Sequence, residues 1–253
     1  MNPWLIAPPV ALTAAAAATA YGAAYPSAQL FGPTVWRTNS PQKLAITFDD
    51  GPNPKITPEL LDLLDQYHAR ATFFVVGRFS RECGDLLRET ARRGHLIGNH
   101  TENHANLFWH GPAEIREELR RCNDAICEVL RAPAKWFRPP WGTRNPWVVS
   151  SAAREGMRTV LWTELPGDWR EKPAEWLIER LQPIARRAQN ASETSNTGQG
   201  RFGDVLCLHD GDHRSLNGNR RRTLDALRYW LPRWRDLGLE FVTIDQAVIP
   251  PAA

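Results

Sequence analysis

Two adjacent carboxylates, Asp49 and Asp50, end an apolar run and stand directly before a Gly-Pro pair. Residues 44–48 have the composition of a buried strand, and Gly51 and Pro52 predict a turn after it. In α/β proteins, binding and catalytic groups collect at the carboxyl ends of strands. Because neighbouring strand residues face opposite ways, we expect one carboxylate to hold a metal ion and the other to move a proton. A solvated Asp-Asp turn is the alternative interpretation.

A second set of metal-binding side chains lies between residues 98 and 104. His100 and His104 are four positions apart, and we expect them on one face of a helical turn, where both imidazoles reach a single ion. Such a pair is weak evidence alone, and it gains weight from the carboxylate of Asp50. Two histidines and one carboxylate with open positions are typical of a catalytic divalent metal. Zinc is our first choice, because nothing in the sequence indicates redox chemistry.

The composition is that of a globular protein with a hydrophobic core. The 253 residues are 42% hydrophobic and 23% charged, and the net charge is only +3. This charge is too small to indicate nucleic acid as a partner, and no long basic block occurs. Eleven tryptophans are many for this length, and tryptophan suits surfaces that stack on sugar rings. We still expect most of them in the core. Trp109 and Trp147, near the second and third motifs described below, are possible sugar-binding platforms, with core packing the favoured interpretation.

The four cysteines are Cys83, Cys122, Cys127 and Cys207. No Cys-x-x-Cys pair occurs among them, which argues against a cysteine zinc site. We expect buried thiols, and the sequence leaves their disulfide status open.

The N-terminal segment differs from the rest of the chain. No charged residue precedes Arg37, and residues 4–24 are almost all apolar or small. This stretch has the length of a signal-peptide core or of a short membrane anchor, although no basic residue precedes it. We favour export or membrane association through residues 4–24, and therefore an extracytoplasmic location. The orientation stays open, since the charges that follow the segment would place the main domain in the cytoplasm.

From residue 41 onward, predicted strands and helices alternate. Alternating elements indicate parallel strands covered by helices, and their number favours a barrel over a small open sheet. A polar stretch at 190–203 is expected to be a surface loop. We divide the chain into an apolar segment at 1–36 and one α/β catalytic domain at 37–250. The predicted strands are 44–48, 71–76, 96–97, 136–137, 159–162, 204–208 and 240–242, and the predicted helices are 58–67, 81–93, 112–130, 146–155, 173–189 and 219–237.

Five short motifs occur in a fixed order along this domain. They are Thr-Phe-Asp-Asp-Gly at 47–51, His-Thr-Glu-Asn-His at 100–104, Arg-Pro-Pro-Trp-Gly at 138–142, Asp-Trp at 168–169 and Leu-Cys-Leu-His-Asp at 206–210. Together they resemble the motifs of the NodB-type polysaccharide deacetylases, carbohydrate esterase family 4. The resemblance implies a distorted (β/α) barrel and the metal-dependent removal of N-acetyl, or sometimes O-acetyl, groups from sugars.

The resemblance assigns the metal to Asp50, His100 and His104, and the general base to Asp49. Zinc is expected, with cobalt, nickel or manganese as alternatives. A bound metal lowers the pKa of its water from about 15.7 toward about 7 and polarises the acetyl oxygen. Arg138 is expected to keep the carboxylate of Asp49 ionised and to fix its orientation.

The resemblance also supplies a general acid, His209, which would protonate the departing amine. Histidine suits this role because its charge changes near working pH. Asp168 of the fourth motif is expected to orient this imidazole and to raise its pKa.

Four further residues are expected to bind the substrate. The backbone N–H of Trp141 would stabilise the negative oxygen that forms during hydrolysis, and its indole would stack on the sugar. Trp169 would line an apolar pocket for the acetyl methyl group, and Pro139 belongs to the same set. Cys207 stands where the family usually has leucine, so we expect an altered acetyl pocket or a reactive thiol beside the site.

The leading hypothesis is a deacetylase that acts on a polymer containing N-acetylglucosamine, such as peptidoglycan or a chitin-like oligosaccharide. Two alternatives keep the fold: an esterase for O-acetylated xylan and a hydrolase for a non-sugar amide. A third is an inactive carbohydrate-binding protein, which would be expected to lack the base or the acid. Asp49 and His209 are both present.

Overall fold

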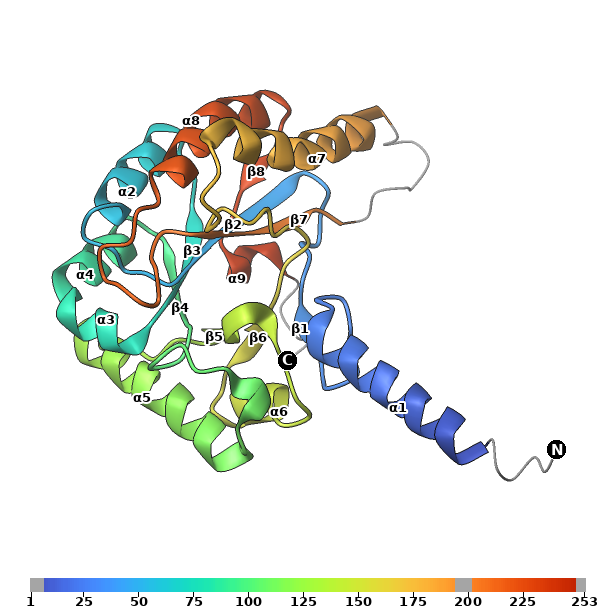
Figure 1. Cartoon of the computed structure of the whole chain (residues 1–253). Helices are drawn as coiled ribbons and strands as arrows, with labels where there is room; N and C mark the ends of the chain where they lie inside the picture. Colours follow the sequence, from blue (N-terminus) through green and yellow to red (C-terminus); the bar gives the residue numbers. More distant parts are fainter. Residues whose placement is uncertain (1–6, 194–201, 249–253) are drawn as a thin grey trace.

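A computed structural model describes residues 7–193 and 202–248. In this part of the chain, eight parallel strands form one sheet in the order β1-β6-β5-β4-β3-β2-β7, and β8 pairs with the start of β2 (Figure 1). The sheet is strongly curled, and helices cover its outer side. The strands are β1 (Thr34–Val35), β2 (Lys43–Asp49), β3 (Ala71–Val75), β4 (Leu96–Asn99), β5 (Trp136–Phe137), β6 (Arg158–Val160), β7 (Asp204–His209) and β8 (Glu240–Phe241).

The two ends of the sheet are joined by the residues that follow β6. The N–H groups of Thr163 and Glu164 donate to the carbonyl of Val205 in β7, at 3.0 and 3.2 Å. The N–H of Cys207 donates back to the carbonyl of Glu164 at 2.9 Å. These bonds close the curled sheet, which confirms the predicted distorted (β/α) barrel.

The strands at the centre of the barrel are buried on both faces. All of β3, and every residue of β2 after Lys43, is buried, as expected for parallel strands with helices on one side and packed side chains on the other. Leu44, Ile46 and Phe48 alternate along β2 and pack into the core beneath the helices. The carboxyl ends of these strands meet at one end of the barrel, where polar side chains of different strands come together.

The helices follow the apolar spacing of the sequence. Helix α5 has the predicted bounds, and it begins at Pro112 with the side chain of Glu114 accepting the N–H of Gly111 at 2.9 Å. The single helix predicted at 81–93 is wrong, because the chain breaks at Cys83 into two helices. The helices are α1 (Ala7–Ala24), α2 (Thr57–Gln66), α3 (Gly77–Glu82), α4 (Gly84–Arg92), α5 (Pro112–Leu130), α6 (Val148–Arg154), α7 (Ala174–Glu193), α8 (Arg221–Asp236) and α9 (Ile244–Ala247), with short 3-10 turns η2 (Leu107–Trp109) and η3 (Pro140–Gly142).

The predicted surface loop at 190–203 is shorter than expected. Helix α7 continues to Glu193, so residues 190–193 are helical. The remainder of that prediction, at 194–201, lies outside the described residues.

The segment before residue 37 is tied to the barrel. Helix α1 projects away from the sheet (Figure 1), while β1 pairs with β6. Between them, the buried guanidinium of Arg144 donates to the carbonyls of Tyr25 and Ala28, and its backbone N–H donates to the carbonyl of Ala23 at 3.1 Å. Burial lowers the pKa of Arg144 to about 10. Among helices within 7–193 and 202–248, none has both the length and the apolarity needed to cross a membrane.

We predict that Arg144→Met destabilises the protein by about 1–3 kcal/mol, because buried carbonyls would lose their donor. The measurement is urea unfolding followed by tryptophan fluorescence. Arg154→Met, at an exposed position of α6, is the matched control and should change the free energy of unfolding by less than about 0.5 kcal/mol. Equal free energies of unfolding for the two variants would contradict the stabilising role of the hydrogen bonds from Arg144.

Candidate active site

A cavity of about 320 Å³ opens at the carboxyl ends of the strands. Most of the predicted site residues line this cavity. Arg138 and Asp168 do not line it, but they contact the lining residues Asp49 and His209. Pro139 is buried and is not among the lining residues. The lining consists of Asp49, Asp50, His100, His104, Trp141, Trp162, Leu165, Trp169, Cys207, His209, Asp212, His213, Arg214 and Arg220.

Asp49 is the last residue of β2, and its carboxylate faces the neighbouring strands. Oδ1 accepts from Nη1 of Arg138 at 2.8 Å, and Oδ2 accepts from the thiol of Cys207 at 3.3 Å. His100 Nε2 lies 3.9 Å from Oδ2. Asp49 is buried, yet it is one of the residues that line the cavity. It is therefore an oriented proton acceptor.

Arg138 follows β5 and is fully buried. Besides Asp49, Nη1 donates to the hydroxyl of Thr47 at 2.6 Å, and Nη2 donates to the carbonyl of Leu161 at 3.1 Å. The guanidinium lies over the ring of Phe74, 4.3 Å from its centre, a geometry that favours a cation. A charge with these partners is held in one position, and it fixes Asp49 in turn.

Asp50 points in a different direction from Asp49, because its backbone leaves the strand with a φ of 70°. Its Oδ1 lies 3.1 Å from Nε2 of His104 and 3.5 Å from Nε2 of His100, and its Oδ2 lies 3.4 Å from Nδ1 of His213. Burial alone would raise the pKa of Asp50, but the three imidazoles outweigh it and hold the pKa well below the ordinary value. Asp50 is an ionised carboxylate among ring nitrogens.

The two histidines of the second motif converge without a helix, so the predicted helical turn is wrong. Residues 100–104 form an irregular loop in which Thr101 and His104 have φ values of 67° and 56°. Nδ1 of His100 donates to the carbonyl of Arg138 at 2.8 Å. That bond fixes the tautomer and leaves the lone pair of Nε2 facing Asp50, as in second-shell contacts of metal-binding histidines.

His104 and His209 have opposite electrostatic environments. Burial lowers the pKa of His104 to about 4, so its ring is neutral and free to act as a ligand. Burial also opposes the charge on His209, but the carboxylate of Asp168 outweighs it and raises the pKa of His209 to about 9. Asp168 Oδ1 accepts from Nδ1 of His209 at 2.8 Å, and Oδ2 accepts from the backbone N–H of His209 and the hydroxyl of Thr223. His209 is thus a charged, oriented proton donor.

Three indoles form the aromatic part of the cavity wall. Trp141 is about half exposed, has a φ of 56° and lies edge-on to His104, with ring centres 4.4 Å apart. Gly142 also has positive φ, and a β-carbon there would lie 2.3 Å from the indole of Trp162. Trp169 packs edge-on to His209 at 5.1 Å. The exposed indoles of Trp141 and Trp169 flank the polar groups.

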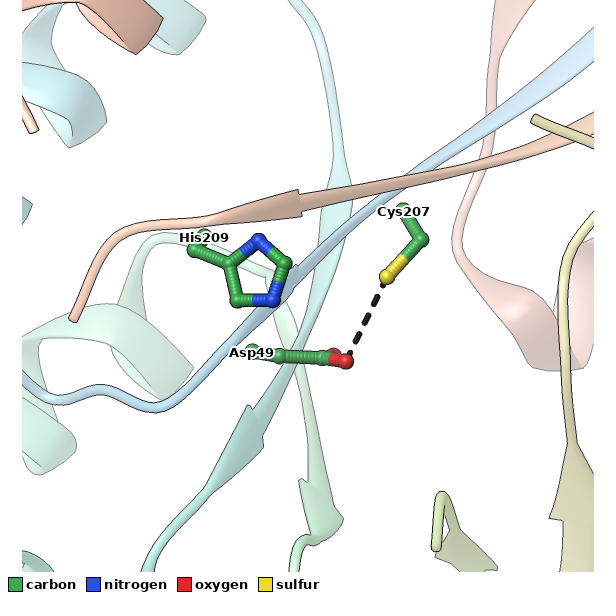
Figure 2. Close-up of side chains that lie close together, drawn as sticks. All are labelled: Asp49, Cys207 and His209. Carbon is green, nitrogen blue, oxygen red and sulfur yellow. Dashed lines mark hydrogen bonds between the residues drawn. The ribbon is translucent and has the colours of Figure 1, made fainter. Parts of the chain in front are cut away.

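Cys207 points toward Asp49 from β7, next to His209 (Figure 2). Cys207 is 1% exposed, and burial together with the charge of Asp49 raises the pKa of its thiol well above the ordinary value. The expected reactive thiol is therefore wrong, because reactivity requires the thiolate. Cys207 is a hydrogen-bond donor to Asp49. All four cysteines are free thiols.

Comparisons with known proteins agree with these motifs. Residues 37–160 match the family model for polysaccharide deacetylase. A peptidoglycan-N-acetylglucosamine deacetylase of Bacillus cereus is 32% identical, with 85% of this chain and 92% of the relative covered. The chain belongs to the polysaccharide deacetylase family. The family resemblance is confirmed, and the protein is a hydrolase of this class.

Two further similarities support the assignment of this protein to the polysaccharide deacetylase family. A chitooligosaccharide deacetylase of Azorhizobium caulinodans is 33% identical, with 77% of this chain and 89% of the relative covered. The crystal structure of a peptidoglycan N-acetylglucosamine deacetylase superposes with a TM-score of 0.72 at 25% identity, covering 85% of this chain and 92% of that chain. The structural similarity therefore includes nearly the whole barrel.

Some lining residues of the deacetylase pocket were not predicted from the sequence. Trp162, Leu165, Arg214 and Arg220 line the cavity although they belong to none of the five motifs. His213, three residues after the fifth motif, also lines the cavity; its place in the sequence indicates a solvated loop or a substrate contact, and no spacing rule connects it to Asp50. The core assignment of Trp109 and Trp147 is wrong, since both indoles are exposed.

The donors around Asp50 fit a divalent metal ion. Oδ1 of Asp50 and Nδ1 of His104 are buried, and neither has a hydrogen-bond partner among the residues that the structure describes. Donor atoms of Asp50, His104 and His213 all lie within 4.8 Å of one another, and His100 adds a further ring nitrogen near the carboxylate. A carboxylate with several imidazoles suits zinc, cobalt or nickel.

Proposed function

We propose that this protein removes N-acetyl groups from N-acetylglucosamine units of a polysaccharide or oligosaccharide, peptidoglycan or a chitin-like chain, by metal-dependent hydrolysis. One observation carries the proposal: a single cavity holds a carboxylate paired with arginine, a carboxylate surrounded by imidazoles, and a histidine charged by a third carboxylate. These are the groups that amide hydrolysis needs. The names of the relatives, peptidoglycan and chitooligosaccharide deacetylases, support the substrate class.

Asp50, His100 and His104 would hold the ion, with zinc as our first choice and cobalt, nickel or manganese as alternatives. When bound, the metal would polarise the acetyl carbonyl and lower the pKa of the attacking water. The neutral ring of His104 suits this role, since burial has already lowered its pKa to about 4. The bond from His100 to the carbonyl of Arg138 orients the second ring.

Asp49 would take the proton of the attacking water. A general base must be correctly placed, and Arg138 holds it in position through its bond of 2.8 Å to Oδ1. The thiol of Cys207 donates to the other oxygen. Asp49 is therefore held by two donors, one on each oxygen, at the wall of the cavity.

His209 would protonate the leaving amine, because Asp168 keeps it charged and directs Nε2 toward the cavity through the bond at Nδ1. The backbone N–H of Trp141 would stabilise the oxyanion. The indoles of Trp141 and Trp169 would pack on the sugar and on the acetyl methyl group, and Pro139 would support the turn that carries Trp141.

We predict acetate release from N-acetylated chitooligosaccharides or from peptidoglycan, and no release from acetyl-xylan. Chelation should abolish the activity, and added Zn²⁺ or Co²⁺ should restore it. The measurement is an enzymatic assay for free acetate on each substrate, before and after dialysis against a chelator. Activity after complete removal of the metal would contradict the mechanism, and release from xylan alone would contradict the N-deacetylase assignment.

The charge on His209 predicts a pH dependence. Its pKa is raised to about 9, so the acid is protonated below that pH, and kcat/KM should fall as the pH rises through it. Asp168→Asn removes the largest cause of the upward shift and should move the alkaline limb of the profile about 1–3 units lower. Asp236→Asn, at an exposed position of α8, is the control and should leave the limb in place. An unmoved limb in Asp168→Asn would contradict the role of His209.

A further inference from the structure

His213 lies in the loop between β7 and α8, outside the motifs that define the site. Its ring stacks on the ring of His104, with centres 4.0 Å apart and an angle of 11° between the planes. Its Nδ1 faces Oδ2 of Asp50 at 3.4 Å, while His104 Nε2 faces the other oxygen at 3.1 Å. The two rings therefore point their nitrogens at the same carboxylate from neighbouring positions.

The loop that carries His213 is fixed to its surroundings. Arg78 donates through Nη2 to the carbonyl of His213. Asp212 pairs with Arg220 at 3.5 Å. Gly211 lies so close to the backbone of Asp50 that a β-carbon on it would be 2.1 Å from the carbonyl oxygen. These contacts hold the loop against β2, so the imidazole is placed by the fold.

The carboxylate of Asp50 and the ring of His213 each have an atom that could still bind an ion. Oδ1 of Asp50 is buried, and within residues 7–193 and 202–248 it has no hydrogen-bond partner. His213 is three-quarters buried, and its Nδ1 contacts Asp50 at 3.4 Å, which is longer than a normal hydrogen bond of about 2.9 Å. One donor atom each of His213, His104 and Asp50 lie within 4.8 Å of one another. An ion between them would satisfy all three.

We propose that His213 is an additional protein ligand of the divalent metal, bound through Nδ1. This inference rests on the proposed function, because it concerns the same metal. Imidazole nitrogen is a favoured donor for zinc and cobalt. With Asp50, His100 and His104, His213 gives the ion four protein donors. The fourth donor strengthens retention of the metal while the pocket is empty of substrate.

The test is the affinity and coordination of Co²⁺ in His213→Ala and His213→Gln. Metal-free protein is titrated with Co²⁺ against a competing chelator, and the visible absorption spectrum of the loaded protein is recorded. We expect each variant to bind Co²⁺ about 10–100-fold more weakly and to show a changed visible band, because one nitrogen donor is lost. His68→Ala, on the exposed turn before β3, is the matched control and should behave as the parent protein.

His104→Ala separates failure of this inference from failure of the metal site. If His104→Ala loses Co²⁺ and His213→Ala does not, the site stands and His213 is not a ligand. If neither variant changes the affinity, the metal site proposed for Asp50 is itself wrong. An unchanged spectrum with a raised KM in His213→Ala would show that His213 contacts substrate and would overturn the inference. Circular dichroism of each variant verifies that the barrel is folded.

Discussion

The buried ion pair between Arg138 and Asp49 is the interaction on which the site depends. A guanidinium withdrawn from water is costly unless it is paired and fully hydrogen-bonded. Here the carboxylate of Asp49, the hydroxyl of Thr47 and the carbonyl of Leu161 accept from its two terminal nitrogens, so one charge connects β2, β5 and the chain after β6. Removing either partner would leave an uncompensated charge in the barrel, at a cost of about 3–5 kcal/mol. The same pair that orients Asp49 therefore contributes to holding the strand ends together.

Residues of the same type have different environments in this site, and therefore different charges or orientations. Asp49 and Asp50 are neighbours, but the left-handed backbone at Asp50 turns its carboxylate away from Arg138 and toward the imidazoles. Likewise, burial leaves His104 neutral, whereas Asp168 keeps His209 charged. A neutral imidazole suits a ligand, and a charged one suits an acid. Backbone direction and pairing thus give chemically identical side chains different environments within one cavity.

Much of this arrangement was predictable from the sequence, because apolar runs and ordered motifs place the strand ends that carry the site. The bounds of α5 and β5 agree with the prediction. Positive φ at Thr101 and His104 was not predictable, since neither residue is a glycine and the spacing suggested a helix. The position of His213 depends on how a loop packs against Asp50, which no local pattern encodes. Exposure of Trp109 and contact of Cys207 with Asp49 are equally properties of tertiary packing.

The central claim is that Asp49 and Asp50 have different roles, the first as base and the second as ligand. The most direct measurement is the metal content of Asp49→Asn and Asp50→Asn, determined together with turnover of an N-acetylated chitooligosaccharide. The account predicts that Asp49→Asn retains its metal and loses turnover by about 10²–10⁴-fold, whereas Asp50→Asn loses metal and activity together. Loss of metal in Asp49→Asn with retention in Asp50→Asn would reverse the two roles and contradict the account.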